Sequence, residues 1–148
     1  MRKVSLFLFG CFLFLLPAFL SAQTAAELEV VLESPVVSYD QAALFVLGAA
    51  DGSAGSGAFD QAMERGWLPK KAARENPATM GGLSFLMMKA FGIKGGMMYA
   101  IFPGPRYAFR TMTARSLIQG ASDPSMSVSG ERFLQILGNV LSAAGGEQ

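Results

Sequence analysis

Aromatic and basic residues suited to holding a sugar gather in one glycine- and proline-rich stretch, residues 92–105, and just beyond it. Tyr99, Phe102 and Tyr107 could form an aromatic wall, because sugar rings stack on aromatic faces. Arg106 could offer a planar fork of N–H donors to an acidic sugar group. The glycines would let the backbone approach a ligand closely. The candidate binding site is therefore a group of four residues: Tyr99, Phe102, Arg106 and Tyr107.

A structural role for the same aromatic residues is the competing interpretation. Tyr99, Phe102 and Tyr107 would then close the core between two units of the chain, and no ligand would be needed to explain them. The methionine pairs that accompany them in the sequence are suited to filling irregular gaps in such a core. The sequence leaves both interpretations open.

The chain lacks the residues on which most catalytic designs depend. It has no histidine and a single cysteine, Cys11, which excludes most general-base, Ser-His and zinc-dependent sites. It has neither a phosphate-binding glycine motif nor the glycine-flanked serine of an esterase. Its carboxylates do not fall in matching, apolar-flanked positions. The sequence therefore predicts that the protein is not an enzyme, with no catalytic residue, no metal and no cofactor.

The N-terminus has the three parts of a secretory signal peptide. Arg2 and Lys3 give a basic start, residues 4–20 are almost wholly apolar, and the run ends in small residues, of which Ala22 is the last. We expect residues 1–22 to be cleaved off, so that the protein is exported to the periplasm or cell envelope. The apolar run is also long enough to cross a bilayer. An uncleaved anchor is therefore the alternative, and contact with a membrane is expected only in that case.

Loss of Arg2 and Lys3 would change the charge balance. The full chain has 12 Lys and Arg residues against 11 Asp and Glu residues, so the exported chain would carry one more acidic than basic residue. Proteins that bind nucleic acid have a strongly basic character, so nucleic acid is not expected as a partner. Cys11 would be lost with the signal peptide, which leaves no thiol for a disulfide.

An apolar pattern recurs after fifty positions without a gap, in residues 58–91 and 108–141, and a shorter copy occupies residues 37–50. The second half of each copy has the i, i+3, i+4, i+7, i+8 spacing of one buried helix face. One such unit cannot bury its own face, so the units must pack together. The three stripes consist of Ala42, Phe45, Val46, Ala49 and Ala50; Leu83, Leu86, Met87, Ala90 and Phe91; and Phe133, Ile136, Leu137, Val140 and Leu141.

A hydroxyl residue precedes each stripe by four positions, where a helix N-cap belongs. These residues are Ser38, Thr79 and Ser129. In the first copy, Ser38 and Gln41 also have the spacing of a capping box, in which each side chain satisfies a backbone N–H of the other residue. We therefore expect the three hydroxyls to cap three helices.

The sequence predicts an all-α protein in which residues 23–148 form one helical domain. Three helix-loop-helix units would cover about residues 24–50, 57–91 and 105–143. The second helices should meet at the centre, because their apolar stripes are wider and more regular than those of the first helices. The middle residues of the three stripes should then be buried: Phe45, Leu86 and Ile136.

The repeating unit resembles the S-layer homology module. In that family, three modules form one pseudo-threefold helical body, and each second helix begins in an aliphatic-Thr-Arg-Ala-Glu motif. The aliphatic and hydroxyl positions of this motif are matched here by Val37-Ser38, Ala78-Thr79 and Val128-Ser129. The family's arginine is replaced by Tyr39, Met80 and Gly130, and its glutamate by Gln41, Gly82 and Arg132.

The resemblance covers about residues 24–144 and implies a fold and a function. The family anchors proteins non-covalently to cell-wall polymers, and its arginine and glutamate help to hold the ligand. Our first hypothesis is therefore a non-enzymatic, exported cell-envelope protein that binds a wall polymer or another envelope component. The second hypothesis is a structural or assembly subunit that binds another envelope protein through an exposed apolar patch.

Overall fold

The computed structural model describes residues 25–52 and 55–146, and within these ranges the fold is all-α, without strands. The expected signal peptide, residues 1–22, lies outside the described residues. A short helix at residues 25–33 comes first. The helices that follow are α2 (Tyr39–Asp51), α3 (Ala58–Glu64), α4 (Met80–Ala90), α5 (Met97–Ile101), α6 (Pro105–Ala114) and α7 (Gly130–Gly146).

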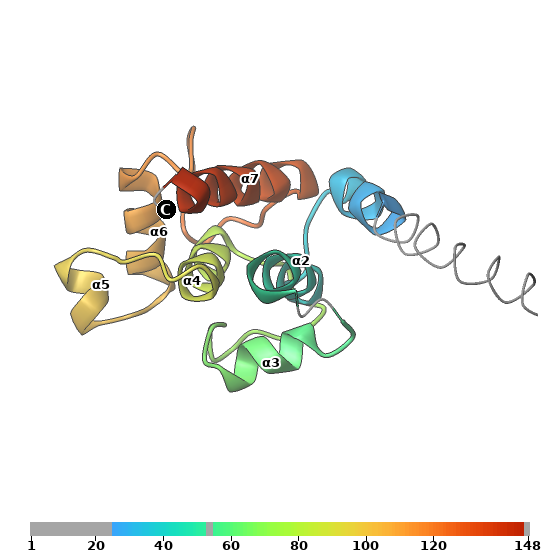
Figure 1. Cartoon of the computed structure of the whole chain (residues 1–148), viewed down its shortest axis with the longest axis horizontal. Coiled ribbons are helices and arrows are strands. Elements are labelled where there is room, and N and C mark those ends of the chain that lie inside the picture. Colours follow the sequence, from blue (N-terminus) through green and yellow to red (C-terminus); the bar gives the residue numbers. More distant parts are fainter. Residues whose placement is uncertain (1–24, 53–54, 147–148) are drawn as a thin grey trace, which may run out of the picture.

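Helices α2 and α4 lie side by side near the centre of the molecule, α7 runs along one side of them, α3 lies on the opposite side, and α5 and α6 lie beyond α4 (Figure 1). The expectation that all three second helices meet at the centre therefore holds for α2 and α4, which pack against each other, but not for α7. Helix α4 packs against α2 on one side and against α6 on the other, while α3 packs against α2. Every residue of α4 from Met80 to Met88 is buried. Such a helix, apolar on all sides, is stable only when other elements cover it completely.

The three residues expected at the centre of the core differ in burial. Leu86 is 0% exposed and Ile136 is 3% exposed. Phe45 is only partly buried, and its ring meets the Phe133 ring edge-on, with 6.4 Å between the ring centroids. Full burial was therefore the wrong prediction for Phe45, because this residue lines an open groove at the edge of the core.

A closed cycle of backbone hydrogen bonds joins α2, α4 and α7 at their N-terminal ends. The first residue of each helix donates its N–H to a carbonyl in the segment that leads into the next one. These bonds run from Tyr39 to Asn76 (3.1 Å), from Met80 to Met126 (2.8 Å) and from Gly130 to Ser34 (2.9 Å). The first N–H groups of a helix have no partner inside the helix, so the cycle satisfies three of them at once.

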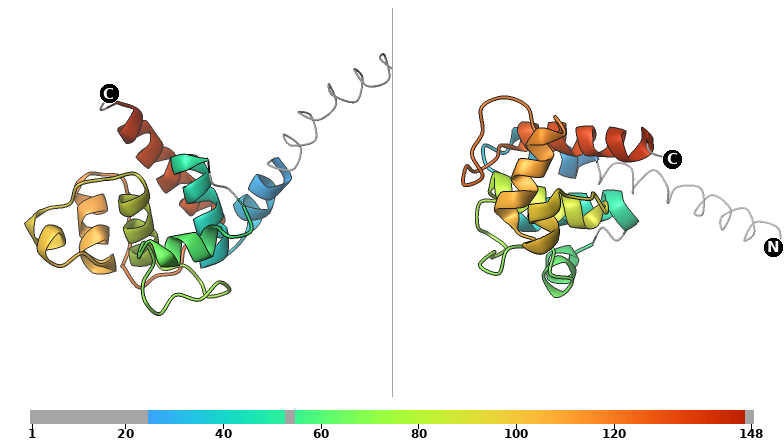
Figure 2. Two further views of the ribbon diagram at one scale, coloured as in Figure 1. Left: turned by 60° about the horizontal axis from the view of Figure 1, so that its bottom comes forward. Right: turned by 90° about the vertical axis from the view of Figure 1, so that its left-hand side faces the viewer.

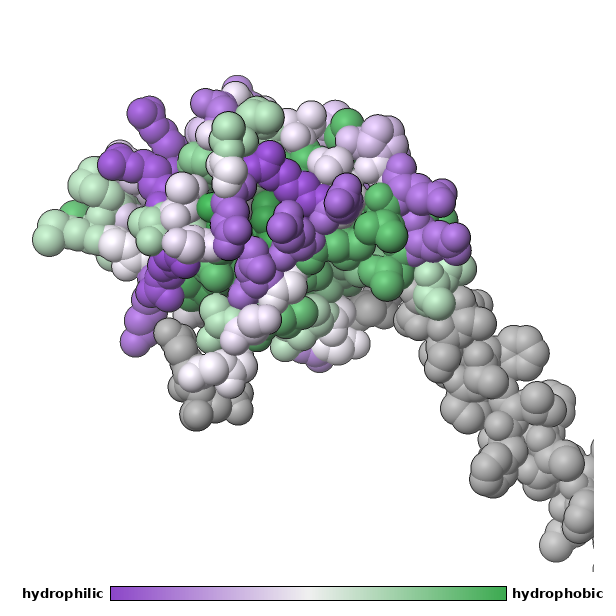
Figure 3. All heavy atoms as spheres, turned by 90° about the horizontal axis from the view of Figure 1, so that it is seen from above, coloured by the Kyte–Doolittle hydropathy of each residue, from purple (hydrophilic) through white to green (hydrophobic). Residues whose placement is uncertain are grey.

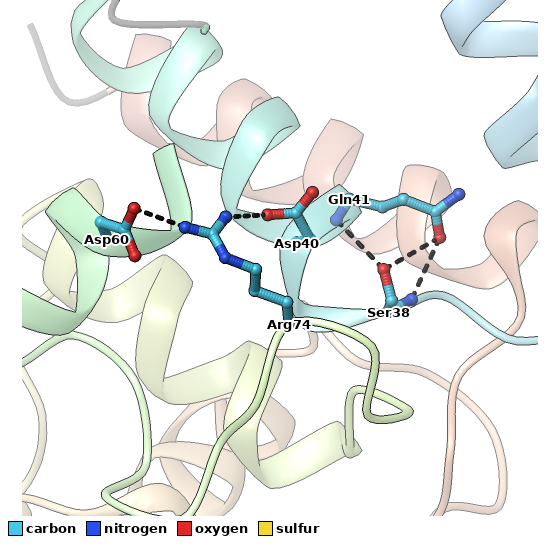
Figure 4. A network of polar contacts seen from close by, with 5 residues as sticks. All are labelled: Ser38, Asp40, Gln41, Asp60 and Arg74. Atoms are coloured by element: carbon cyan, nitrogen blue, oxygen red, sulfur yellow. Dashed lines mark hydrogen bonds and ion pairs between the residues drawn. The ribbon is translucent and has the colours of Figure 1, made fainter. Parts of the chain in front are cut away.

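The hydroxyls of Ser38, Thr79 and Ser129 lie at the same three helix starts. Each accepts a hydrogen bond from the backbone N–H three residues later: from Gln41 at 3.3 Å, from Gly82 at 3.1 Å and from Arg132 at 3.4 Å. The Ser38 N–H also donates to Gln41 Oε1 at 3.1 Å, which completes a capping box (Figure 4). Each hydroxyl thus satisfies a further N–H that the helix itself leaves unpaired.

Replacing Thr79 by alanine should lower the free energy of unfolding by about 1 kcal/mol, because the N–H of Gly82 loses its acceptor at a partly buried helix start. Urea unfolding followed by circular dichroism measures this change. Thr79→Ser is the matched control, since serine keeps the hydroxyl. Equal stability of the alanine and serine variants would contradict a capping role.

The outer helices α3 and α6 end in the same way, fifty residues apart. Each is followed by a residue with positive φ, Gly66 at 67° and Ser116 at 59°. Serine rarely adopts this conformation, which glycine takes without strain. At each end, a backbone N–H then donates to the carbonyl five residues earlier. Trp67 donates to Ala62 at 2.9 Å, and Leu117 donates to Met112 at 3.0 Å. The two loops therefore leave their helices in the same direction.

Arg74 connects α2 with α3 (Figure 4). Its guanidinium donates to Asp40 Oδ1 at 2.8 Å and to Asp60, and it lies 5.0 Å from the centroid of the Phe59 ring. The Arg74 carbonyl accepts a hydrogen bond from the Asp40 N–H at 3.1 Å. The sequence pattern around Arg74 is that of a solvated charged loop, but this residue ties the loop to two helices.

Candidate functional site

The stretch that carries the candidate binding residues forms one isolated helical turn, α5, between α4 and α6. Gly92, with φ of 62°, ends α4, and the Ile93 N–H bonds back to the Met88 carbonyl at 2.9 Å. Pro105 occupies the first turn of α6, where the missing N–H of proline costs nothing. Glycine and proline thus restrict α5 to five residues and set it apart from its neighbours.

A cavity of about 510 Å³ lies between the α5 segment and α6. Tyr99 and Tyr107, two of the four predicted residues, line it together. Three cations that the sequence analysis did not include line it as well: Lys94, Arg110 and Arg115. None of the described residues that line this cavity is Asp or Glu. The cavity therefore combines aromatic faces with an excess of positive charge.

Tyr99 joins the cavity to the core. Its ring meets the Phe85 ring edge-on, with 6.5 Å between the centroids. Its hydroxyl oxygen is shielded from solvent and has no hydrogen-bond partner among the described residues. Burial raises the pKa of the Tyr99 phenol above its ordinary value, because the charged form would lose its hydration. Since the hydroxyl is shielded, Tyr99 offers the cavity its aromatic ring rather than its hydroxyl group.

The three cations have different roles in the wall of the cavity. Arg115 follows α6 and donates to the Lys94 carbonyl at 2.9 Å, which fixes the segment before α5 against the end of α6. Neither Lys94 nor Arg110 forms an ion pair with any residue in the described part of the chain. Both side chains are exposed and are free to meet an anionic ligand.

The other two predicted residues, Phe102 and Arg106, do not line this cavity. Phe102 follows α5 and is 60% exposed. Arg106 lines a neighbouring cavity of about 540 Å³ together with Arg110 and Asp123. Two hydrogen bonds from Ser125 lower the pKa of Asp123, so this second cavity has a carboxylate beside its two arginines, unlike the cavity between α5 and α6. The structure therefore brings two of the four predicted residues, Tyr99 and Tyr107, together in one cavity and places Phe102 and Arg106 outside it.

The helical period explains why Arg106 lies outside the cavity and why Arg110, which the sequence analysis did not include, lines it. Arg106 and Tyr107 are adjacent on α6, and adjacent helical residues face in directions about 100° apart. Residues three and four apart share a face, so Tyr107 shares its face with Arg110, Thr111 and Ala114, which all line the cavity. This spacing is visible in the sequence and would have found Arg110.

Two positions that correspond to the arginine and glutamate of the S-layer homology motif have no room for a side chain. A Cβ at Gly82 would lie 2.2 Å from the hydroxyl of Tyr39, which is itself 3.2 Å from Thr79 Oγ1. A Cβ at Gly130 would lie 1.5 Å from the Val31 carbonyl oxygen. Close packing occupies these two positions, so the family's arginine and glutamate would not fit there without displacing Tyr39 and the backbone at Val31.

An apolar groove of about 640 Å³ lies on another face, between the helix at residues 25–33, α2 and α7. Glu27 is the one charged residue in its lining. Gly48 and Gly138 contribute no side chains to it. The remaining lining residues are Leu28, Leu32, Leu44, Phe45, Ala49, Leu134, Leu137 and Leu141.

Among residues 25–52 and 55–146, no three His, Cys, Asp or Glu side chains come together in a way that could hold a metal ion. None of the helices in the described part of the chain is both long and apolar enough to span a bilayer.

Comparisons with protein-family models, with curated proteins and with solved structures each found no match to this chain. Its function is therefore inferred from the two cavities, the apolar groove and the arrangement of the helices.

Proposed function

We propose that this is a non-enzymatic, exported cell-envelope protein that binds an anionic wall polymer in the cavity between α5 and α6. The observation that carries the proposal is the lining of this cavity, with two tyrosines, three cations and no carboxylate among its described residues. Tyrosine faces suit sugar rings, and guanidinium and ammonium groups suit carboxylate or phosphate substituents. A volume of about 510 Å³ is within the range of sites for small ligands.

We further propose that the chain is a divergent S-layer homology domain made of three units. The closed cycle of hydrogen bonds from Tyr39, Met80 and Gly130 supports this arrangement, because equivalent residues make equivalent bonds around one axis. The matching ends of α3 and α6 support it for the second and third units. The signal-peptide pattern of residues 1–22 supports export, which would bring the domain to the cell envelope.

The polymer proposal is tested by removing the two unpaired cations of the cavity. The double variant Lys94→Gln, Arg110→Gln should bind purified cell wall about a hundredfold more weakly, because each charge-assisted hydrogen bond to an anionic group contributes about tenfold. Co-sedimentation with purified cell wall measures the affinity. The melting temperature should stay unchanged, since both side chains are exposed and unpaired.

The control is Lys70→Gln, Lys71→Gln, which removes two positive charges from exposed positions outside this cavity. It should bind within about twofold of the unchanged protein, because salt screens charges that do not touch the ligand. An equal loss of binding in both variants would show that the overall charge of the protein, and not the cavity, determines its affinity for the wall. Undiminished binding by the Lys94 and Arg110 variant would remove this cavity as the site.

The apolar groove favours a second candidate function, a subunit that assembles with another envelope protein. Exposed apolar surface of this extent, with one charged residue in its lining, is typical of protein interaction sites. A pull-down with purified cell wall, carried out beside one with isolated envelope proteins, discriminates the two functions. Retention by the wall alone favours the cavity, and retention by an envelope protein alone favours the groove.

A further inference from the structure

Helix α5 exposes large apolar side chains on a single helical turn. None of its five residues is buried. Met97 is 79% exposed, Met98 46% and Ile101 59%, and Phe102, which follows directly, is 60% exposed. Four adjacent side chains of this kind form an apolar surface that folding alone does not explain, because their burial would stabilise the protein.

This apolar tip, defined as Met97, Met98, Ile101 and Phe102, lies at one end of the molecule. Figure 1 and the left view of Figure 2 both show α5 at the periphery, on the far side of α6 from the molecular centre. In the space-filling view, an apolar projection marks the same end, and hydrophilic residues cover the surface beside it (Figure 3). The tip is thus convex and reachable, unlike the groove between α2 and α7.

Positive charge adjoins the tip. Met97 and Met98 share the cavity between α5 and α6 with Lys94, Arg110 and Arg115, and no carboxylate is among its described lining residues. A protein partner could cover the apolar side chains, but it would also have to match these cations. A bilayer with anionic headgroups satisfies both requirements, because its acyl boundary accepts apolar side chains while its surface attracts Lys and Arg.

We propose that the apolar tip inserts into the interface of a bilayer that contains anionic lipids. The dimensions agree with this, since a helix with its side chains is about 10 Å across and interfacial helices bury one face by about 5–10 Å. The inference goes beyond wall-polymer binding and does not depend on it. Ile101 and Phe102 insert in this scheme but do not line the polymer cavity, so the two functions can be tested separately.

The test uses the chain from Gln23 onwards, which contains every described residue and lacks the apolar residues 4–20. Binding is measured by co-sedimentation with vesicles of phosphatidylcholine alone and of phosphatidylcholine with phosphatidylglycerol. We expect binding to the anionic vesicles and little to the neutral ones. The double variant Ile101→Glu, Phe102→Glu should bind the anionic vesicles about a hundredfold more weakly, because two apolar side chains no longer enter the interface.

A matched control keeps the charge change and moves it away from the tip. Val30 and Val36 are 61% and 40% exposed, and they lie on or just after the helix at residues 25–33 and outside the apolar groove. The double variant Val30→Glu, Val36→Glu should keep most of its affinity for anionic vesicles. Circular dichroism of both variants verifies that they remain folded, as expected for exposed positions.

Insertion itself is measured with an environment-sensitive fluorophore. The chain from Gln23 has no cysteine, so Ile101→Cys gives one labelling site at the tip and Val30→Cys gives one away from it. On addition of anionic vesicles, emission from the label at position 101 should shift to the blue, while the label at position 30 should not respond.

Four results would overturn the proposal. Failure to bind either kind of vesicle would exclude a membrane role for the tip. An equal loss of affinity in the two glutamate variants would show that added charge is responsible. Vesicle binding without a blue shift at position 101 would reduce the interaction to adsorption through the cations. Dissociation of a dimer by Ile101→Glu, Phe102→Glu, seen by analytical ultracentrifugation, would instead assign the tip to a second copy of the chain.

Discussion

Replacing Leu86 by alanine should lower the free energy of unfolding by about 2–5 kcal/mol. Leu86 is 0% exposed and lies near the middle of α4, whose residues are buried from Met80 to Met88. Helices α2 and α6 both pack against α4, so the surroundings cannot collapse easily into the space that alanine leaves. The cost therefore includes a cavity in addition to the lost burial of the side chain. Urea unfolding followed by circular dichroism measures it.

Leu141→Ala is the matched control, since it removes the same atoms from a residue that is 41% exposed on α7. It should cost less than about 1 kcal/mol, because little apolar surface returns to water and no closed cavity forms. Similar losses in the two variants would mean that α4 is not the centre of the core. The difference between the variants is the informative quantity, because effects on the unfolded state cancel to a large extent.

Local spacing in the sequence was sufficient to predict the all-α fold and the three capped helix starts. The stripes in α4 and α7 have the period of a helix, and a hydroxyl four residues before each stripe lies where a cap is needed. These inferences succeed because helix period and N–H satisfaction depend on residues close in the sequence. The partial burial of Phe45 depends instead on the open groove between α2 and α7, which joins segments far apart in the sequence and cannot be predicted from a local pattern.

The candidate site could be predicted only in part. Tyr99 and Tyr107 were found because aromatic residues cluster in the sequence, but Phe102 and Arg106 were grouped with them by proximity in the chain alone. Arg110 was accessible to sequence reasoning through its spacing from Tyr107 on α6. Lys94 and Arg115 were not, because the contact between the Lys94 carbonyl and Arg115 joins residues 21 apart through the path of the intervening turn.

Two glycines of α7 should respond in opposite directions to the same substitution. Gly130→Ala should lower the free energy of unfolding by about 3 kcal/mol, because the added Cβ would lie 1.5 Å from the Val31 carbonyl oxygen. That atom belongs to the backbone and cannot turn aside as a side chain can. Separating the two segments would also break the hydrogen bond from the Gly130 N–H to the Ser34 carbonyl, one of the three bonds of the cycle.

Gly138→Ala should instead raise the free energy of unfolding by about 0.5–1 kcal/mol. An added Cβ would meet nothing within 4 Å apart from the backbone of its own helix. Glycine loses more conformational freedom than alanine when it folds into a helix, so alanine is favoured at this position. Urea unfolding of both variants beside the unchanged protein measures the two effects. Gly138 lies inside α7 while Gly130 is its first residue, so helix propensity accounts for at most about 1 kcal/mol of the contrast, and the remainder reports the space around each residue. If Gly130→Ala were as stable as Gly138→Ala, the close approach of α7 to the helix at residues 25–33 would be wrong. The cycle of hydrogen bonds that supports a three-unit domain would then lose one of its three members.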